Sequence, residues 1–383
     1  MKRTVYNSDH DAFRKMLREF IAKEVVPVYD DWEKAGFASR DLYRKLGELG
    51  VMGFDIPEEY GGVGPTSYKY QAIVAEEAAA AGVMLGNQEL STGIVLPYLL
   101  ALANEEQRAR WLPGCATGEI ILAIAMTEPG AGSDLAGIRT SVRRSGDHFV
   151  LNGEKTFITN GSQADLIIVV VRTSAPDPDN RRTGLSLLVV DTTSDGFAVG
   201  RRLDKIGLKS SDTCEISFTD VHVPVQNLLG EQGRAFDYLT RNLPRERLAI
   251  GVTGYATARA AIDFTLDYVR NREVFGRTVA SFQNTKFVLA ECQAEVTALE
   301  SLIDRALELE ENGDLTAEDA AMCKLVGTEV AGRVIDKCLQ LHGGYGYILE
   351  YPIARLYADT RVSRIYGGTS EVQKTIIAKS MGL

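Results

Sequence analysis

The order of patterns along this chain predicts a multidomain α+β protein: a helical unit, a β unit and a second helical unit. Apolar residues recur at helical spacing near both ends, whereas short β-branched runs separated by turn residues fill the middle. With 383 residues the chain is too long for one ordinary core, so several packed units are expected. We expect an N-terminal helical domain at 1–119, a middle β domain at 120–231 and a C-terminal four-helix bundle at 232–383.

The N-terminal unit is predicted to consist of helices interrupted by one loop. Apolar side chains within 13–21 repeat at helical spacing, and Ser39 is the expected N-cap of a helix that carries the leucines of 42–49. Glycines and prolines then break the chain between residues 50 and 65. Two alanine-rich segments, 68–81 and 89–102, are expected to be helical again.

The middle unit has the patterns of short strands. Segments 165–171 and 185–190 are apolar and rich in β-branched residues, and apolar and polar residues alternate over 214–219. Turn signals such as Asn152-Gly153 and Asn160-Gly161 separate such runs. We expect a compact antiparallel β unit, either a sandwich or a barrel.

The C-terminal unit is predicted to be a four-helix bundle. Apolar residues step by three and four within 248–269 and 321–341. Two further helical segments are expected at 283–311 and 351–379. Four helices joined by short breaks are typical of a bundle.

Composition excludes several classes of function. The formal charge of −10 argues against a nucleic-acid surface, which would be basic. No run of about 18 apolar residues predicts a membrane-spanning helix. The five cysteines are scattered and form no C-x-x-C pair, and the four histidines show no paired spacing, so no metal site is expected.

The same features predict a cytoplasmic protein. The basic start, Met1-Lys2-Arg3, is not followed by the apolar segment that a secretory signal needs. An odd number of cysteines fits a reducing compartment better than a disulfide framework.

The first motif with chemical meaning is Met-Thr-Glu-Pro-Gly-Ala-Gly-Ser-Asp at 126–134. Its glycines free the backbone, while Thr127 and Ser133 offer hydroxyl groups that can bond the edge of a flavin ring or a pyrophosphate. An ordinary Gly/Ser turn is the alternative. The motif is not a Rossmann fingerprint, because Leu135 stands where a glycine or alanine is needed and no βαβ unit surrounds it.

Two further motifs combine an aromatic ring with polar groups. In 155–161, Phe157 stands beside Thr159, so the strand could pack against and bond a flat heteroaromatic ring; ordinary strand packing is the alternative. In 270–277, Arg272 could bind a phosphate and Phe275 could stack on a ring. A solvated basic helix end is the alternative for that segment.

Two glycine motifs interrupt the C-terminal helices. In 340–346, glycines break a helix and permit close backbone approach, while His342 taken alone is more often structural than catalytic. In 365–371, Gly367 and Gly368 precede a polar run that opens the last helix. Such a turn can approach a ligand with the exposed N–H groups of the helix behind it.

Individually these motifs are weak, but in this order across a helical–β–helical layout they resemble the acyl-CoA dehydrogenase family of flavoproteins over nearly the whole chain. Ile-Tyr-Gly-Gly-Thr-Ser-Glu at 365–371 and Leu-His-Gly-Gly-Tyr-Gly-Tyr at 341–347 are most similar to its long-chain and isovaleryl-type branches. The resemblance implies FAD-dependent oxidation of an acyl-CoA thioester to the trans-2-enoyl-CoA, a step of fatty acid β-oxidation. It also implies an electron-transferring flavoprotein as the acceptor.

The resemblance implies that FAD lies between the β domain and the bundle. A neighbouring subunit completes its site, in a homotetramer built as a dimer of dimers. The family often has tryptophan where this chain has Phe157. The residues implied to hold FAD are Met126, Thr127, Gly132, Ser133, Phe157, Thr159, Arg272, Phe275, Gln283, Gln340, Gly343, Gly344, Thr369 and Glu371.

The resemblance also raises the question of the catalytic base. The base is often a glutamate at the position of Gly367, which has no carboxylate. In the long-chain and isovaleryl-type branches a glutamate in a Glu-Arg-Leu context replaces it. Glu246 stands in that context here, within the segment 243–248 that we expect to open the first bundle helix. The implied roles are Glu246 as base, the N–H at Gly367 as donor to the thioester oxygen, and substrate contacts from Gly368, Ser133 and Arg247.

An exposed glutamate that stabilises a helix N-terminus is the alternative role for Glu246. An efficient base needs a pKa near the working pH, so we expect an apolar pocket to raise the pKa of Glu246, with Arg247 opposing the shift if the two pair.

Other functions remain as alternatives. The same fold could serve as a non-catalytic or hetero-oligomeric subunit, although the FAD motifs and Glu246 speak against this. An acyl-CoA oxidase would pass electrons to oxygen, but oxidases of this fold are usually much longer. A DNA-binding relative is disfavoured by the charge of −10 and the lack of a basic extension. The acyl chain and the acceptor stay open.

Overall fold

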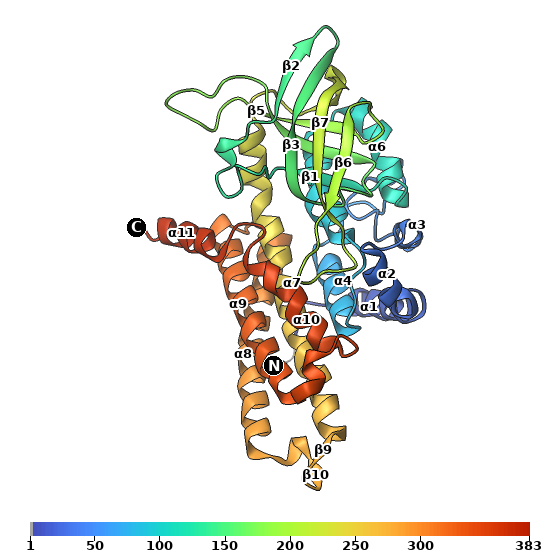
Figure 1. Cartoon of the computed structure of the whole chain (residues 1–383), viewed down its shortest axis with the longest axis vertical. Helices are drawn as coiled ribbons and strands as arrows, with labels where there is room; N and C mark the ends of the chain where they lie inside the picture. The colour runs from blue at the N-terminus through green and yellow to red at the C-terminus, as the bar shows by residue number, and fades with distance from the viewer. Residues whose placement is uncertain (1–2) are drawn as a thin grey trace.

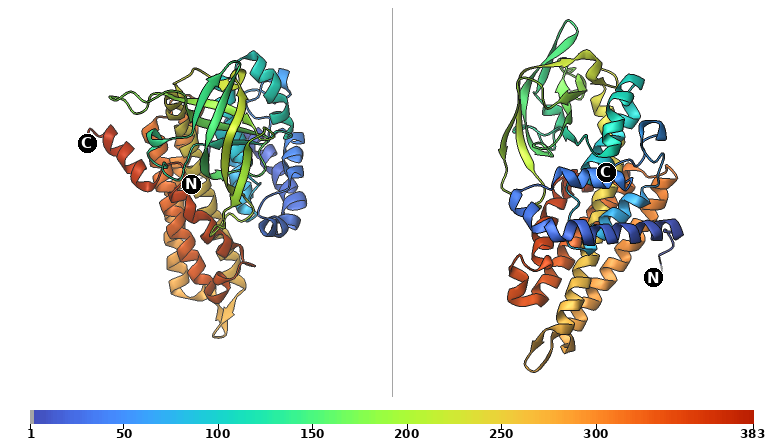
Figure 2. Two further views of the ribbon diagram at one scale, coloured as in Figure 1. Left: turned by 45° about the horizontal axis from the view of Figure 1, so that its top comes forward. Right: turned by 90° about the vertical axis from the view of Figure 1, so that its right-hand side faces the viewer.

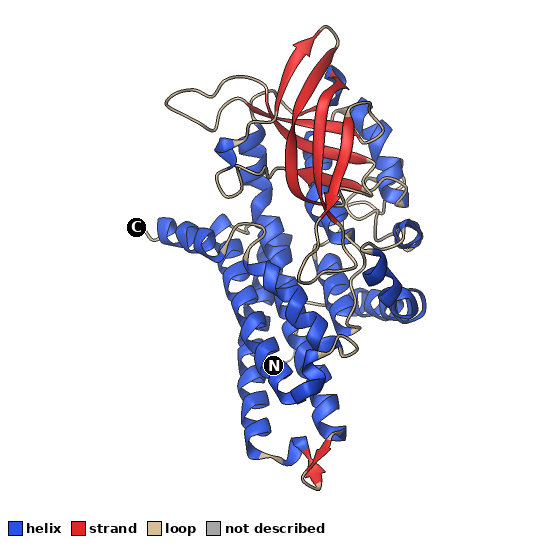
Figure 3. Ribbon diagram, in the orientation of Figure 1, coloured by secondary structure: helices blue, strands red, loops and turns tan. Residues whose placement is uncertain are grey.

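The computed structural model describes residues 3–383, so Met1 and Lys2 of the basic start lie outside the described residues. Helices, a sheet and a second set of helices follow one another, as predicted (Figures 1 and 3). The sheet lies at one end of the molecule and the long C-terminal helices extend away from it. The residues at which the three domains divide stay a prediction.

The N-terminal unit contains six α-helices within the described residues. Ser39 caps the third, accepting a hydrogen bond from the N–H of Asp41 at 3.2 Å, as predicted. The segment predicted as helix at 89–102 begins with a π-helical turn, Leu90–Val95, before it becomes α-helical. The α-helices are α1 (Ser8–Phe20), α2 (Tyr29–Ala35), α3 (Arg40–Glu48), α4 (Lys69–Ala80), α5 (Leu96–Leu102) and α6 (Glu105–Thr117).

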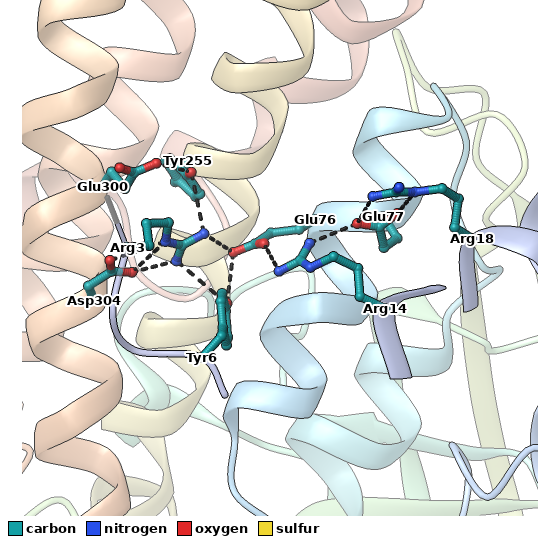
Figure 4. A network of polar contacts seen from close by, with 9 residues as sticks. All are labelled: Arg3, Tyr6, Arg14, Arg18, Glu76, Glu77, Tyr255, Glu300 and Asp304. Atoms are coloured by element: carbon teal, nitrogen blue, oxygen red, sulfur yellow. Dashed lines mark hydrogen bonds and ion pairs between the residues drawn. The ribbon is translucent and has the colours of Figure 1, made fainter. Parts of the chain in front are cut away.

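A charged network joins this unit to the C-terminal helices (Figure 4). The Arg3 guanidinium contacts Glu76 of α4 at 2.8 Å and also pairs with Asp304 of α8 (Gln283–Glu311). Arg14 of α1 contacts Glu76 at 2.6 Å and Glu77 at 2.7 Å. Because these groups are largely buried, removing one partner would leave a charge uncompensated, so the network holds the first helix against the bundle.

The middle unit is one curled, eight-stranded sheet with the order β6-β7-β3-β2-β4-β5-β8, and β1 pairs with β4. Residues of β4 alternate between two cores: Ile168 packs with the cluster that includes α6, and Ile167 packs inside the curled sheet. The strands are β1 (Leu122–Ala125), β2 (Ser141–Ser145), β3 (His148–Thr159), β4 (Leu166–Arg172), β5 (Leu185–Asp191), β6 (Phe197–Arg202), β7 (Thr213–Pro224) and β8 (Leu228–Leu229).

The expectation of a purely antiparallel unit is wrong for two pairings. Strands β1 and β2 both run parallel to β4, whereas the other neighbours in this sheet are antiparallel. A parallel pair needs a long connection, and between β1 and β4 the chain passes through a loop and the whole β2–β3 hairpin. The alternation of apolar residues carries no information on strand direction, which is why the sequence could not show this.

The C-terminal unit consists of α7 (Ala235–Asn271), α8, α9 (Ala317–His342), α10 (Pro352–Thr360) and α11 (Ser370–Ser380). Helices α7 and α9 pack backbone to backbone: the approach is so close that a Cβ at Gly251 would lie 2.9 Å from the carbonyl oxygen of Cys323. Helix α11 points away from the other four (Figures 1 and 2).

The prediction of one helix at 351–379 is wrong, since α10 and α11 are separate. The 3₁₀ turn Arg361–Arg364 and the glycines that follow divide them. Gly367 and Gly368 have φ angles of +61° and +90°, which no helix continues through.

Within residues 3–383 all five cysteines are buried and unpaired. Over the same residues, no three His, Cys, Asp or Glu side chains gather in a way that could hold a metal ion. No helix in the described part of the chain combines the length and apolarity that crossing a membrane requires.

Candidate active site

Glu246 lies in the interior of α7, about three turns after its first residue. The expectation that the segment around Glu246 opens this helix is wrong, and so is the alternative that Glu246 stabilises a helix N-terminus. The helix begins earlier, because the turns before Pro244 are held by Ala235 and Leu239, which pack in a core shared with the sheet. Helix α7 therefore runs from the sheet into the bundle (Figure 1).

The carboxylate of Glu246 faces the glycine turn before α11. A Cβ at Gly367 would lie 3.5 Å from Oε1 of Glu246. Burial raises the pKa of Glu246, and the charges of Arg247 and Lys324 act in the opposite direction. The site therefore holds a carboxylate with a raised pKa at the place where a side chain at position 367 would begin.

Arg247 is 6% exposed and its Nε has no hydrogen-bond partner. It forms no ion pair within residues 3–383, so it opposes the shift of Glu246 by its charge without a direct contact. A buried guanidinium nitrogen without a partner is costly, which makes Arg247 a candidate contact for an anionic or carbonyl group of a ligand.

The glycine turn presents backbone donors to this region. Across the described residues, the N–H groups of Gly367, Gly368 and Thr369 donate no hydrogen bond. The carbonyl of Gly367 accepts from Nε2 of Gln373 at 3.1 Å, and that of Gly368 accepts from the same atom at 2.8 Å and from the ammonium of Lys324. Successive free N–H groups at a helix start are suited to a negatively charged oxygen.

Thr369 and Glu371, predicted to contact a cofactor, begin α11. The hydroxyl of Thr369 caps this helix by accepting from the N–H of Val372 at 3.4 Å, and Glu371 is exposed in its first turn.

The loop 126–134 lies beside the C-terminal half of β3. The N–H of Thr156 donates to the carbonyl of Thr127 at 2.9 Å. Behind the loop, the buried ammonium of Lys155 donates to the carbonyl of Met126 at 3.0 Å and to Glu128 at 2.9 Å. Burial lowers the pKa of Lys155 to about 8, while Glu128 acts to raise it. This pair fixes the loop against the strand.

Several of the residues predicted to contact a flavin ring are exposed to solvent. Phe157 is 66% exposed and has a φ of +59°, at a β-bulge where β3 shifts register against β7. Gly132 has open space around it and Ser133 is exposed, whereas Thr159 is half-buried. An exposed ring beside hydroxyl and backbone donors fits the edge and face of a flat, polar ring system, so these residues fit FAD.

A second predicted cofactor group gathers at the far end of α7. Arg272 ends that helix and lies 5.1 Å over the ring of Tyr345, close to Gly343 and Gly344. Phe275, in the hairpin of β9 (Glu273–Val274) and β10 (Arg277–Thr278), is 95% exposed. Gln283 begins α8, and Gln340 is exposed near the end of α9.

His342 is buried in this region. Its ring stacks on Tyr268 at 4.3 Å, and Nδ1 lies 3.0 Å from the carbonyl of Cys338. These contacts agree with the structural role preferred for it from sequence.

One chain does not bring the two cofactor groups together. About 26 residues of α7 separate Glu246 from Arg272, which at 1.5 Å per residue is roughly 39 Å along the helix. The distal group is therefore too far from Glu246 to share a site with it in the same chain.

Sequence reasoning missed Lys324, Gln373 and the Lys155–Glu128 pair. A signal for Lys324 was present: it follows Ala321 by three residues and precedes Thr328 by four, which places a lysine on the apolar face of α9. No comparable signal identifies Gln373, since its contacts depend on the path of the glycine turn.

The arrangement around Glu246 suits proton abstraction next to a carbonyl group. A carboxylate with a raised pKa can take the proton, and the free N–H groups of the turn can stabilise the negative oxygen that forms.

Models of three domains match consecutive parts of the chain. The acyl-CoA dehydrogenase N-terminal domain matches residues 7–119, the middle domain 123–221 and the C-terminal domain 233–382. The chain is 42% identical over 379 residues to the mitochondrial long-chain specific acyl-CoA dehydrogenase of Sus scrofa, covering 99% of this chain and 88% of that protein.

Solved structures agree with these matches. The acyl-CoA dehydrogenase from Geobacillus kaustophilus is similar with a TM-score of 0.96 and 43% identity, covering 100% of both chains. An acyl-CoA dehydrogenase from Bacillus anthracis, complexed with FAD, has a TM-score of 0.91 and 32% identity, covering 100% of this chain and 69% of that one.

Proposed function

This chain belongs to the acyl-CoA dehydrogenase family of FAD-dependent oxidoreductases acting on CH–CH bonds, and we propose that it converts a saturated acyl-CoA to the trans-2-enoyl-CoA with an electron-transferring flavoprotein as acceptor. The position of Glu246 opposite Gly367 supports the proposal most directly, because it supplies a base where the turn itself has none.

In this proposal Glu246 removes the α-proton of the thioester. Its pKa is raised by burial, which brings a carboxyl closer to the pH at which it can both lose and accept a proton. The proton moves from the α-carbon to a carboxylate oxygen, while negative charge develops on the thioester oxygen. Bound FAD would accept the β-hydrogen as hydride.

The developing oxyanion requires donors that are already oriented. We assign this role to the N–H of Gly367, and we place Gly368, Ser133 and Arg247 in contact with the substrate. The N–H groups of the two glycines are free of other hydrogen bonds in the described chain, and the Nε of the buried Arg247 has no partner. Such groups are worth most where water is excluded.

The proposed FAD site has two halves from two subunits. The group of Met126, Thr127, Gly132, Ser133, Phe157 and Thr159 would hold the flavin end, with Thr369 and Glu371 at the closing turn. The distal group of Arg272, Phe275, Gln283, Gln340, Gly343 and Gly344 would hold the other end from a neighbouring subunit.

Two observations support this division. Within one chain the distal group lies far along α7 from Glu246, and the rings of Phe157 and Phe275 are both exposed and free to contact a ligand. We therefore propose a homotetramer built as a dimer of dimers. Its buried, unpaired thiols fit the cytoplasm as its compartment.

Anaerobic titration of the purified holoenzyme with straight, branched and steroid-linked acyl-CoA thioesters tests the proposal. Loss of the flavin absorbance with at least one thioester, and formation of the 2-enoyl product, is the expected result. No bleaching with any member of the panel would exclude the dehydrogenase function. Steady peroxide production in air would identify an oxidase, and a chain purified without FAD would identify a non-catalytic subunit.

A further inference from the structure

Lys324 is a buried lysine that lies behind the glycine turn and has no role in the proposed chemistry so far. It belongs to α9 and is 1% exposed. Its ammonium donates a hydrogen bond to the carbonyl of Gly368. Gln373 of α11 is fully buried, and its Nε2 donates to the carbonyls of both Gly367 and Gly368.

These contacts determine how the turn presents its donors. In a planar trans peptide the N–H points opposite to the C=O. With the carbonyls of Gly367 and Gly368 held toward Lys324 and Gln373, the N–H groups of Gly368 and Thr369 point the other way. The same contacts fix the two peptides that follow Gly367. The direction of the Gly367 N–H relative to these peptides is then set by the left-handed φ of Gly367, +61°.

Packing makes the position of Lys324 rigid. Its neighbour Cys323 has its carbonyl against Gly251, and the glycines at 254 and 327 let α7 and α9 meet backbone to backbone. A shift of one helix against the other would create clashes, so the ammonium stays at a defined place beside the turn.

The charge of Lys324 also reaches the base. Glu246 and Arg247 on α7 and Glu371 on α11 are the charged groups that act on it. The pKa of Lys324 is lowered to about 8, mainly by burial and also by the charge of Arg247, while the two glutamates act to raise it. In return the ammonium acts to lower the pKa of Glu246.

We propose that Lys324 is a positioning residue of this active site, which together with Gln373 holds the two peptides that follow Gly367 and so keeps the N–H of Gly367 directed toward the substrate oxygen. The inference rests on the proposed function, because it presupposes that an acyl-CoA oxygen occupies the space before the turn. Lys324 itself does not touch the substrate.

The experiment compares four variants of the holoenzyme: K324M, K324R, Q373L and the control K337M. Lys337 lies on the same helix but pairs with Glu291 and Glu295 at 3.3 Å on the bundle surface, so K337M should behave as wild type. Stopped-flow reduction of the flavin by the best thioester of the panel gives the rate and the apparent Kd of the substrate.

A second readout is independent of turnover. A 3-thia-acyl-CoA of the same length can lose its α-proton but has sulfur in place of the β-carbon, so it forms an enolate without being oxidised. The long-wavelength absorbance of that enolate against the flavin, followed across pH, measures how well the turn stabilises the oxyanion.

We expect K324M to slow flavin reduction at least about tenfold with little change in substrate Kd, since a donor held out of place loses part of its effect on the transition state. The analogue should ionise at a pH higher by about one unit or more. The acid limb of the rate profile should move to higher pH, because Glu246 has lost a neighbouring positive charge. Part of both effects should return in K324R, and Q373L should raise the ionisation pH as well.

Wild-type ionisation of the analogue and a reduction rate within about twofold of wild type in K324M would overturn the inference. A loss of thermal stability or FAD with unchanged ionisation would show a purely structural lysine and would overturn it equally. If K324M does not accumulate as holoenzyme, the flavin reduction rate and the analogue ionisation of Q373L test the inference instead. Failure of the proposed function is distinguishable, because then wild type itself is not reduced by any thioester.

Discussion

A side chain at Gly367 would begin 3.5 Å from Oε1 of Glu246, so two positions far apart in sequence reach the same point in space. One belongs to the turn before α11 and the other to the interior of α7. A carboxylate from either position can serve the same substrate carbon. This proximity supports a base that has moved from the turn to α7, and it argues against a site that has lost its base.

We predict that E246Q binds FAD and folds but reduces its flavin at least about 10³-fold more slowly, because the amide cannot accept the α-proton. In wild type the deprotonated carboxyl is the active form. The rate should therefore fall as the pH is lowered through the raised pKa of Glu246, and E246Q should lack this limb.

Rapid-mixing flavin reduction between pH 5 and 9 measures both effects. The matched control is E308Q, which changes a partly exposed glutamate of α8 that pairs with Arg305 at 3.0 Å, far from the glycine turn in sequence. A near-normal rate in E246Q would remove Glu246 from the role of base.

We predict that moving the base back to the turn works only if space is made for it. A Cβ at position 367 would clash with Cδ1 of Ile250, and the left-handed φ adds strain to any residue but glycine. The triple variant E246Q/G367E/I250A should reduce its flavin at least about tenfold faster than E246Q/G367E. Equal rates in both would show that Ile250 does not restrict the position.

We predict that two inactive variants complement each other. If each site takes Glu246 from one subunit and Arg272 from its neighbour, a mixed dimer of E246Q with R272A/F275A contains one intact site. Co-expression of equal amounts should restore about a quarter of wild-type activity, given random pairing of two-fold related subunits. Separately tagged chains verify that the two variants are present in equal amounts in the unfractionated sample, because purification through both tags would enrich the mixed dimers and raise the expected fraction. An inactive mixed dimer would mean that each chain builds its own site.

We predict that Glu89 lowers the stability of the folded protein as the pH rises. Glu89 is a half-buried carboxyl that accepts a hydrogen bond from Tyr68 at 2.9 Å. Burial raises its pKa from 4.5 to about 7, while Tyr68 and Arg245 act to lower it. Between these values the folded state binds more protons than the unfolded state, so stability falls as the pH rises through this window.

The variant E89Q removes this ionisation and keeps an acceptor for Tyr68. The free energy of unfolding of E89Q, relative to that of wild type, should rise by about 1–2 kcal/mol from pH 5 to pH 8. Thermal unfolding at both values measures the gain, with E308Q expected to follow wild type. A gain equal at both pH values would contradict the assignment to Glu89.

Much of the architecture could be predicted because local patterns carry it. The alternation over 214–219 and the helical spacing over 248–269 follow from which face each element buries, and the structure confirms both elements. Strand direction could not be predicted, since β1 and β4 pair through a connection whose path depends on the whole sheet. The expectation that 243–248 opens α7 was wrong, because the packing of Ala235 and Leu239 against the sheet extends the helix to earlier residues.

The sequence by itself determined the helical–β–helical order and the family, and it placed Glu246 beside Arg247 as a candidate base in place of the absent carboxylate at Gly367. Only the tertiary structure decided that Glu246 faces that glycine, that Lys324 and Gln373 hold its turn, and that Arg272 lies far along α7. The physical reason is the short range over which sequence patterns carry structural information. Patterns report how a residue relates to neighbours within a few turns, whereas a site depends on how separate helices pack against one another.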